Sequence, residues 1–307
     1  MRNLLLNVAA ISLIALVSET VARKVIGLGT PPLYESYNGM EYKMKPNQNI
    51  LRFGNRIIIN DASMRTSSDI LNKPKLGKKR VLIFGDSVLW GTSLLDQADI
   101  ATSILGIKLK EDYEIYNVSA GSWGPGNWNQ FIKENGLFNA DQIIFLISSH
   151  DLNDIPNPLT KINKLMPGEN PPFATWELVN RYALPRIQSY LAKIISYNKR
   201  QKTINNNSLI SEGESILNQS INLVNDSGAD FTAVQFWDRR EFENESPDKH
   251  HSIIKDLFID RKVNTIQSLP IFKNCSDNAS DLFLDHIHLS REGQKCLALV
   301  LENAIQR

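Results

Sequence analysis

The stretch RVLIFGDS, residues 80–87, decides the fold of this 307-residue chain. It is a short, continuous apolar run that ends at a glycine, a pattern typical of a strand buried on both faces of a parallel sheet. Similar runs follow at residues 113–118, 142–147 and 231–237, with helical patterns between them. Strands that alternate with helices in this way predict a three-layer α/β/α sandwich around a mostly parallel sheet.

Composition narrows the classes of function. With 42% hydrophobic and 22% charged residues, the chain has the composition of a globular protein. Its formal net charge is +1, and no stripe of Lys and Arg is present, so we expect no nucleic-acid partner. The two cysteines, Cys275 and Cys296, fit no zinc motif. They could form one disulfide in an oxidising compartment or remain two inert core thiols, and we favour the second interpretation.

Residues 1–24 form the first of three regions. Arg2 precedes an apolar run over residues 4–17, which as a helix spans about 21 Å, less than the roughly 30 Å of a bilayer core. The run suits a signal peptide cleaved after Thr20-Val21-Ala22, or an uncleaved anchor that extends to Val21. We favour the anchor, and a helix of a cytosolic protein is a third interpretation. Both leading interpretations predict an exported protein of the cell envelope, with the anchor holding the rest in the periplasm or outside the cell.

The other two regions are a β-rich N-terminal extension with its linker, residues 25–78, and the main α/β domain, residues 79–307. A hairpin is predicted in the extension, because Gly54-Asn55 separates two alternating stretches. The main domain carries a proline-rich insertion, residues 155–205, which contains a predicted helix at 176–197 and could lie over a site.

Three helices of the main domain have candidate start signals. Ser211 and Glu214 form a capping-box pattern, and the helix that follows is predicted to end at Gly228. Ser246, followed by a proline, and Ser290 are predicted to be the N-caps of two later helices.

Polar residues of catalytic type follow the strands. Ligands of open α/β sheets bind beyond the carboxyl ends of the strands, and Ser87 follows the first strand directly. Asp285 and His288 precede the last predicted helix, and a carboxylate in this position can hold the imidazole Nδ1–H. Nε2 is then free to take a proton from Ser87. A purely structural Asp/His pair is the alternative, and a metal site that includes His286 lacks a fourth ligand, so no metal is expected.

Two further segments follow predicted strands and are expected at the same end of the sheet as Ser87. The glycine-rich loop 117–128 includes Gly121, whose backbone N–H can approach a ligand closely. The segment 148–154 is dense in polar groups. Trp123 and Trp128 lie near these loops and could stack on sugar rings, although packing in the core is the commoner role of tryptophan.

Residues 79–304 resemble the SGNH/GDSL hydrolase superfamily of serine esterases and acyl-transfer enzymes. Gly85-Asp86-Ser87 matches its nucleophile motif, Asp285-x-x-His288 matches its Asp-x-x-His block, and Gly121 its oxyanion glycine. The resemblance implies a flavodoxin-like five-stranded sheet, Ser87 as nucleophile, His288 as base and Asp285 as its orienter. It also implies an oxyanion hole built on the N–H groups of Ser87 and Gly121, and no cofactor.

The third block of the family departs from its pattern. Where the family has Gly-x-Asn-Asp or Gly-Asn-Asp, this chain has Ser149-His150-Asp151, so His150 stands in the place of the oxyanion asparagine. A neutral His can donate one N–H, and Asn153 is the alternative donor. In a structural interpretation, His150 is instead bonded to Asp151 or Asp154.

The N-terminal part is similar, less specifically, to bacterial SGNH-type proteins linked to exopolysaccharide production. The similarity lies in the anchor-like segment and in residues 31–34, 47–55 and 64–65. It implies an acylated carbohydrate substrate and partners in exopolysaccharide synthesis. The sequence thus predicts a membrane-tethered esterase that removes O-acetyl groups from a polysaccharide. An O-acetyltransferase with the same triad and a non-catalytic carbohydrate-binding or assembly protein are the alternatives.

Overall fold

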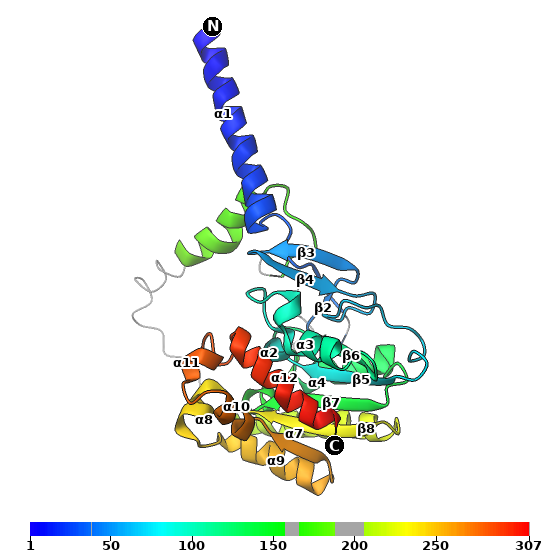
Figure 1. Cartoon of the computed structure of the whole chain (residues 1–307). Coiled ribbons are helices and arrows are strands. Elements are labelled where there is room, and N and C mark those ends of the chain that lie inside the picture. Colours follow the sequence, from blue (N-terminus) through cyan, green and yellow to red (C-terminus); the bar gives the residue numbers. More distant parts are fainter. Residues whose placement is uncertain (38, 157–165, 188–205, 307) are drawn as a thin grey trace.

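The centre of the molecule is a five-stranded parallel sheet (Figure 1). The structure is a computed structural model that describes residues 1–37, 39–156, 166–187 and 206–306. Each pair of neighbouring strands is parallel, and their spatial order confirms the expected flavodoxin-like topology. In that order, the strands are β6 (Tyr113–Ser119), β5 (Lys79–Gly85), β7 (Gln142–Ser148), β8 (Asp230–Phe236) and β9 (Asn264–Gln267).

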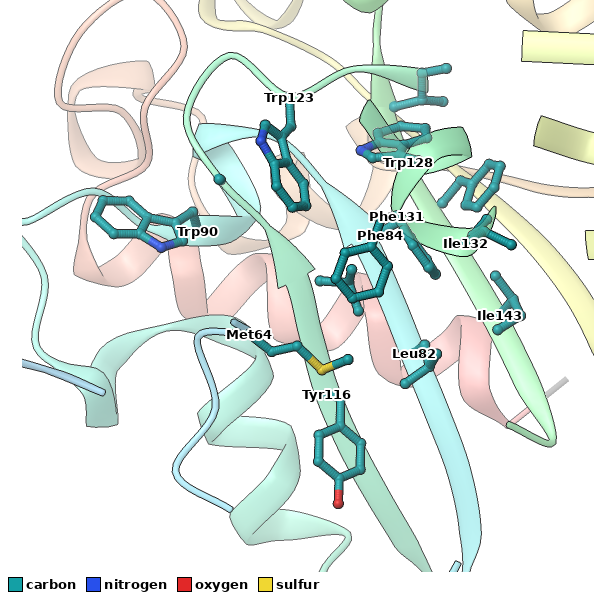
Figure 2. Packing of buried hydrophobic residues seen from close by; sticks show 14 of the residues in the cluster. Met64, Leu82, Phe84, Trp90, Tyr116, Trp123, Trp128, Phe131, Ile132 and Ile143 are labelled. Carbon is teal, nitrogen blue, oxygen red and sulfur yellow. The ribbon is translucent and has the colours of Figure 1, made fainter. Parts of the chain in front are cut away.

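Helices cover both faces of the sheet, which confirms the three-layer sandwich (Figure 1). Along β5 the side chains alternate, so that Leu82 and Phe84 pack in one core and Val81 and Ile83 in the other. Figure 2 shows part of the first core. The long helices of the first face are α4 (Pro125–Asn135), α7 (Asn206–Asn225) and α9 (Lys249–Asp260), and those of the second are α3 (Ala101–Lys108), α10 (Leu269–Cys275) and α12 (Arg291–Ile305). Shorter helical elements are α2 (Ser87–Trp90), η2 (Gln97–Asp99), η3 (Ser149–Leu152), α8 (Arg239–Asn244) and α11 (Ala279–Leu282).

The N-terminal extension packs onto the first core. Its Tyr42 and Met64 are buried there, next to side chains of the main domain. The predicted hairpin is present, but its turn is Phe53-Gly54, one residue earlier than expected, because Arg52 pairs with Asn55. Both turn residues have positive φ, as a tight two-residue hairpin requires. The strands of the extension are β1 (Tyr34–Glu35), β2 (Lys43–Met44), β3 (Gln48–Arg52) and β4 (Asn55–Ile59).

Two of the three predicted helix starts are wrong. α7 already begins at Asn206, so Ser211 lies inside it. α9 is capped by Asp248, whose side chain accepts from the N–H of His250, and not by Ser246. Ser290 caps α12 as predicted, since its Oγ accepts from the N–H of Gly293 at 3.1 Å.

Two segments that lie outside the sandwich, the N-terminus and part of the insertion, are helical. α1 (Arg2–Val21) continues into η1 (Ala22–Ile26) and projects away from the body (Figure 1). In the insertion, α5 (Ala174–Glu177) and η4 (Leu178–Ala183) begin two residues before the helix predicted at 176–197. Beyond residue 187 that prediction lies outside the described residues.

Cys275 and Cys296 form a disulfide, with their Cα atoms 6.3 Å apart. The favoured interpretation of two free thiols was therefore wrong. The bond joins the end of α10 to α12, two helices that pack against each other on the second face of the sheet.

The disulfide predicts a measurable stabilisation. Its residues are separated by 21 positions, and closing a loop of this length stabilises a fold by about 3 kcal/mol in the chain-entropy model. We expect Cys275→Ala/Cys296→Ala to lower the free energy of unfolding in urea by this amount. Reductant should destabilise the wild type and leave the double variant unchanged. Equal stability of the two oxidised proteins would contradict the prediction.

Candidate active site

Ser87 stands at the carboxyl end of β5, where the strand turns into α2. Asp86 caps this helix, since its Oδ1 accepts from the N–H of Val88 at 2.8 Å. Gly85 is needed for close packing, because a Cβ there would lie 2.8 Å from the Cβ of Leu89. As the first residue of α2, Ser87 has an N–H that no carbonyl of the helix can accept. Ser87 thus offers its hydroxyl and its backbone N–H at the same end of the sheet.

The structure brings Ser87, His288 and Asp285 together in a hydrogen-bonded relay. His288 Nε2 lies 2.9 Å from Ser87 Oγ, and His288 Nδ1 lies 2.7 Å from Asp285 Oδ2. The other carboxylate oxygen, Asp285 Oδ1, accepts from the N–H groups of Ile287 and His288 at 2.9 and 2.8 Å. His286 is not part of the relay, and its side chain is 86% exposed.

The same contacts keep Asp285 charged. Burial on its own raises the pKa of this carboxyl. The hydrogen bonds from the His288 side chain and from the two backbone N–H groups outweigh burial and lower the pKa to about 2. At neutral pH, Asp285 is therefore a carboxylate that can orient His288 and stabilise a positive charge on its ring.

His150 is held by acidic and hydroxyl neighbours. Its Nε2 lies 3.0 Å from Asp86 Oδ2, and its Nδ1 lies 2.8 Å from Ser148 Oγ. Ser148 Oγ is also 2.9 Å from Asp151 Oδ2. A hydroxyl has one hydrogen, so with Asp151 as a carboxylate Ser148 donates to Asp151 and accepts from His150 Nδ1. The contact with the Asp86 carboxylate then needs the second ring hydrogen, which makes His150 a cation.

The electrostatics agree with this assignment. Burial lowers the pKa of His150, but the negative charge of Asp151 and the hydrogen bond to Asp86 raise it to about 10. Asp154 adds a further negative charge on the same loop, and burial raises the pKa of its own carboxyl to about 6. Burial also raises the pKa of Asp151.

His150 has no free ring N–H for the oxyanion in this arrangement, whereas the NH₂ group of Asn153 has two hydrogens and its contact with His250 uses at most one of them. Both ring N–H groups of His150 are used by Asp86 and Ser148. Asn153 Nδ2 lies 3.2 Å from Nδ1 of His250. The contacts fit the structural interpretation of His150, although its partners are Asp86 and Ser148 and its distance to Asp151 Oδ1 is 3.7 Å.

This network predicts a pH effect on stability. A histidine whose pKa is raised from about 6.5 to about 10 stabilises the fold fully below pH 6.5 and loses that contribution as the pH rises through 10. We expect His150→Gln, which keeps an amide donor without the charge, to be less stable by about 1 kcal/mol at pH 7. Between pH 7 and 10 its melting temperature should fall less than that of the wild type. A parallel fall in both proteins would contradict the charged assignment.

Gly121 follows β6, and the N-terminal extension holds it in place. The Tyr42 hydroxyl donates to the carbonyl of Gly121, and Trp123 Nε1 donates to the carbonyl of Tyr42 at 3.0 Å. The N–H of Glu41 donates to Asn127 Oδ1 at 3.0 Å. Sequence reasoning missed Tyr42, because nothing in the pattern of the extension shows that it reaches this loop.

Trp123 and Trp128 are not available to a substrate, so their predicted stacking role was wrong. Their exposed fractions are 1% and 0%. Trp128 Nε1 donates to the carbonyl of Gly85 at 3.2 Å, and both indoles pack in the first core (Figure 2). From the core, they support the end of β5 and the loop that contains Gly121.

A cavity of about 450 Å³ lies away from these residues. It is bounded by the N-terminal extension, by α3 and by the first half of β6, and Ser87, His288 and Asp285 do not line it. The cavity touches the first residues of β6, whereas Ser87 follows the carboxyl end of β5. The cavity and the relay are therefore separate.

No protein-family model and no curated protein matches the chain. Solved structures that are similar to it include a member of the lipolytic G-D-S-L family from Veillonella parvula, at 10% identity over 75% of this chain and 99% of that chain, with a TM-score of 0.45. An esterase, EstA, from Pseudoalteromonas sp. is 10% identical over 75% of this chain and 97% of that chain, with a TM-score of 0.44. An acetyl xylan esterase from Geobacillus stearothermophilus is 13% identical over 76% and 97%, with a TM-score of 0.43.

Proposed function

We propose that this protein is a serine hydrolase of acyl esters. The observation that carries the proposal is the relay in which His288 Nε2 lies 2.9 Å from Ser87 Oγ and His288 Nδ1 lies 2.7 Å from Asp285. Ser87 Oγ attacks the acyl carbonyl while His288 takes its proton. His288 then gives this proton to the leaving alcohol as the carbon–oxygen bond breaks, and an acyl-enzyme remains. Water, activated by His288, attacks the acyl-enzyme and releases the acid.

The oxyanion is stabilised by backbone donors in this mechanism. The N–H of Ser87 and the N–H of Gly121 are the proposed donors. The carboxylate of Asp86 is next to the nucleophile and would oppose a developing negative charge. The His150 cation, bonded to Asp86 at 3.0 Å, offsets that charge. We assign His150 this positioning role in place of direct donation to the oxyanion.

The exposure of the relay supports a bulky substrate. Asp285 has 46% of its side chain exposed and His288 27%, so the site is open to solvent. An acyl group on a large carrier can approach such a site from outside. Together with the resemblance to exopolysaccharide-linked proteins, this favours O-acetyl groups on an envelope or exported polysaccharide as the substrate.

We further propose that α1 and η1 anchor the protein in a membrane without being cleaved. The helix Arg2–Ile26 has 25 residues and is long and apolar enough to cross a membrane; its length is about 37 Å. Its last turns contact the body, because Glu19 Oε1 accepts from the N–H of Ala174 and Arg23 donates to the carbonyl of Pro172. Cleavage after Ala22 would remove the first of these contacts, which supports the anchor interpretation.

The proposal is tested with the purified full-length protein. We expect it to hydrolyse p-nitrophenyl acetate and to release acetate from an acetylated polysaccharide, with no turnover by Ser87→Ala. Formation of acetylated sugar from the same donors would instead identify a transferase. Absence of both activities in the folded protein would overturn the hydrolase proposal and favour a carbohydrate-binding protein.

A further inference from the structure

Large apolar side chains are exposed on the helical segment 173–187, beside the end of α1. Phe173 is 59% exposed, Trp176 57% and Ile187 54%. Leu178, Val179 and Leu184 in the same segment are also exposed. Figure 1 shows this segment leaving the base of α1 at an angle, to one side of the body. An apolar surface of this kind is unusual for a helix in contact with water alone.

The residues of this segment that face the rest of the protein are small or polar. Ala174 is fully buried, and Glu177 is 5% exposed. Glu177 accepts from the N–H of Gly29 at 2.6 Å and from Arg52 Nη1 at 3.0 Å. The arrangement is the reverse of an ordinary surface helix, in which the apolar side faces the core.

The segment is fixed at the level where the apolar run of α1 ends. The N–H groups of Ala174 and Thr175 donate to the two carboxylate oxygens of Glu19 at 2.7 and 3.3 Å. Arg23 Nη2 donates to the carbonyl of Pro172 at 2.8 Å. The exposed apolar surface therefore continues directly from that of α1 and of η1, in which Val25 is 65% exposed.

We propose that residues 173–187 lie in the headgroup region of the same membrane that α1 crosses, with Phe173 and Trp176 inserted into its surface. This inference rests on the proposed anchoring by α1. Tryptophan is suited to this depth, because its ring is apolar and its N–H reaches a polar partner. The membrane would then be contacted by α1 and by residues 173–187, which lie at an angle to each other. Together they hold the sandwich in one orientation, whereas α1 alone would leave it free to rotate.

Trp176 is the reporter for the test. Of the four other tryptophans, Trp123 and Trp128 are fully buried, Trp90 is 7% exposed and Trp237 is half-buried. The full-length protein is placed in nanodiscs of brominated or plain phosphatidylcholine, and the emission of Trp176 is taken as the wild type minus Trp176→Phe. We expect this emission to be lost in brominated lipid. Trp176→Phe should keep the esterase activity of the wild type, which shows that it is folded.

A matched control places a tryptophan on an exposed apolar position far from α1. Ile259 on α9 is 59% exposed, so Ile259→Trp in the Trp176→Phe background should give emission that brominated lipid does not quench. Flotation with vesicles separates the two proposals. A protein that floats while Trp176 keeps its emission overturns the surface contact and leaves the anchor. A protein that does not float overturns the anchor and the surface contact with it.

Discussion

Ser87→Ala is expected to lower kcat for ester hydrolysis by at least about 10⁴-fold. The substitution removes the attacking oxygen, while the oxyanion donors and the rest of the relay stay in place. Among the described residues, the Ser87 side chain has one hydrogen-bond partner, His288, so the free energy of unfolding should change by no more than about 0.5 kcal/mol. Steady-state rates on p-nitrophenyl acetate and urea unfolding of the two proteins check both statements. A variant that keeps a substantial part of the wild-type rate would show that another group attacks the ester.

Asp285→Asn is expected to lower kcat by about 10³- to 10⁴-fold at neutral pH. The carboxylate accepts from His288 Nδ1 at 2.7 Å, whereas an amide can turn its NH₂ towards the ring. Nδ1 then becomes the acceptor and Nε2 carries the hydrogen, so that His288 cannot take the proton of Ser87.

His286→Ala is the matched control for Asp285→Asn. Its side chain is 86% exposed, next to Asp285 in the sequence but outside the relay, and its loss should leave kcat unchanged. Equal effects of the two substitutions would indicate a general disturbance of the loop, and they would contradict the orienting role of Asp285.

The central strands were predictable because burial on both faces leaves a continuous apolar run. β9 has no such run: its sequence is Asn-Thr-Ile-Gln, and it is an edge strand with one fully buried residue. One of the two wrong helix starts, that of α9, failed because the sequence offers two caps. Ser246 and Asp248 both suit an N-cap, and only the structure shows that Asp248 accepts from the helix N–H.

The relay was predictable for a different reason. Ser87 follows a strand, where ligands of such sheets bind, and Asp285 and His288 are close in the sequence. Both stretches also resemble motifs of one hydrolase family, which predicted that they meet. The contacts of His150, the contact of Tyr42 with Gly121 and the disulfide depend on how distant segments pack. Trp123 and Trp128 show the same limit, because their loop position is compatible with exposure, and they are buried by the packing of α4 and of the N-terminal extension.

The most direct test of the central claim is the reaction of the full-length protein with a fluorophosphonate, followed by mass spectrometry. The account predicts one covalent adduct, located on Ser87, because this hydroxyl donates to the imidazole of His288. Ser148, the other hydroxyl next to an imidazole among the described residues, donates to Asp151 and accepts from His150. Ser87→Ala should form no adduct, and His288→Ala should form it far more slowly. A folded wild-type protein that forms no adduct, or that is modified on another serine, would contradict the account.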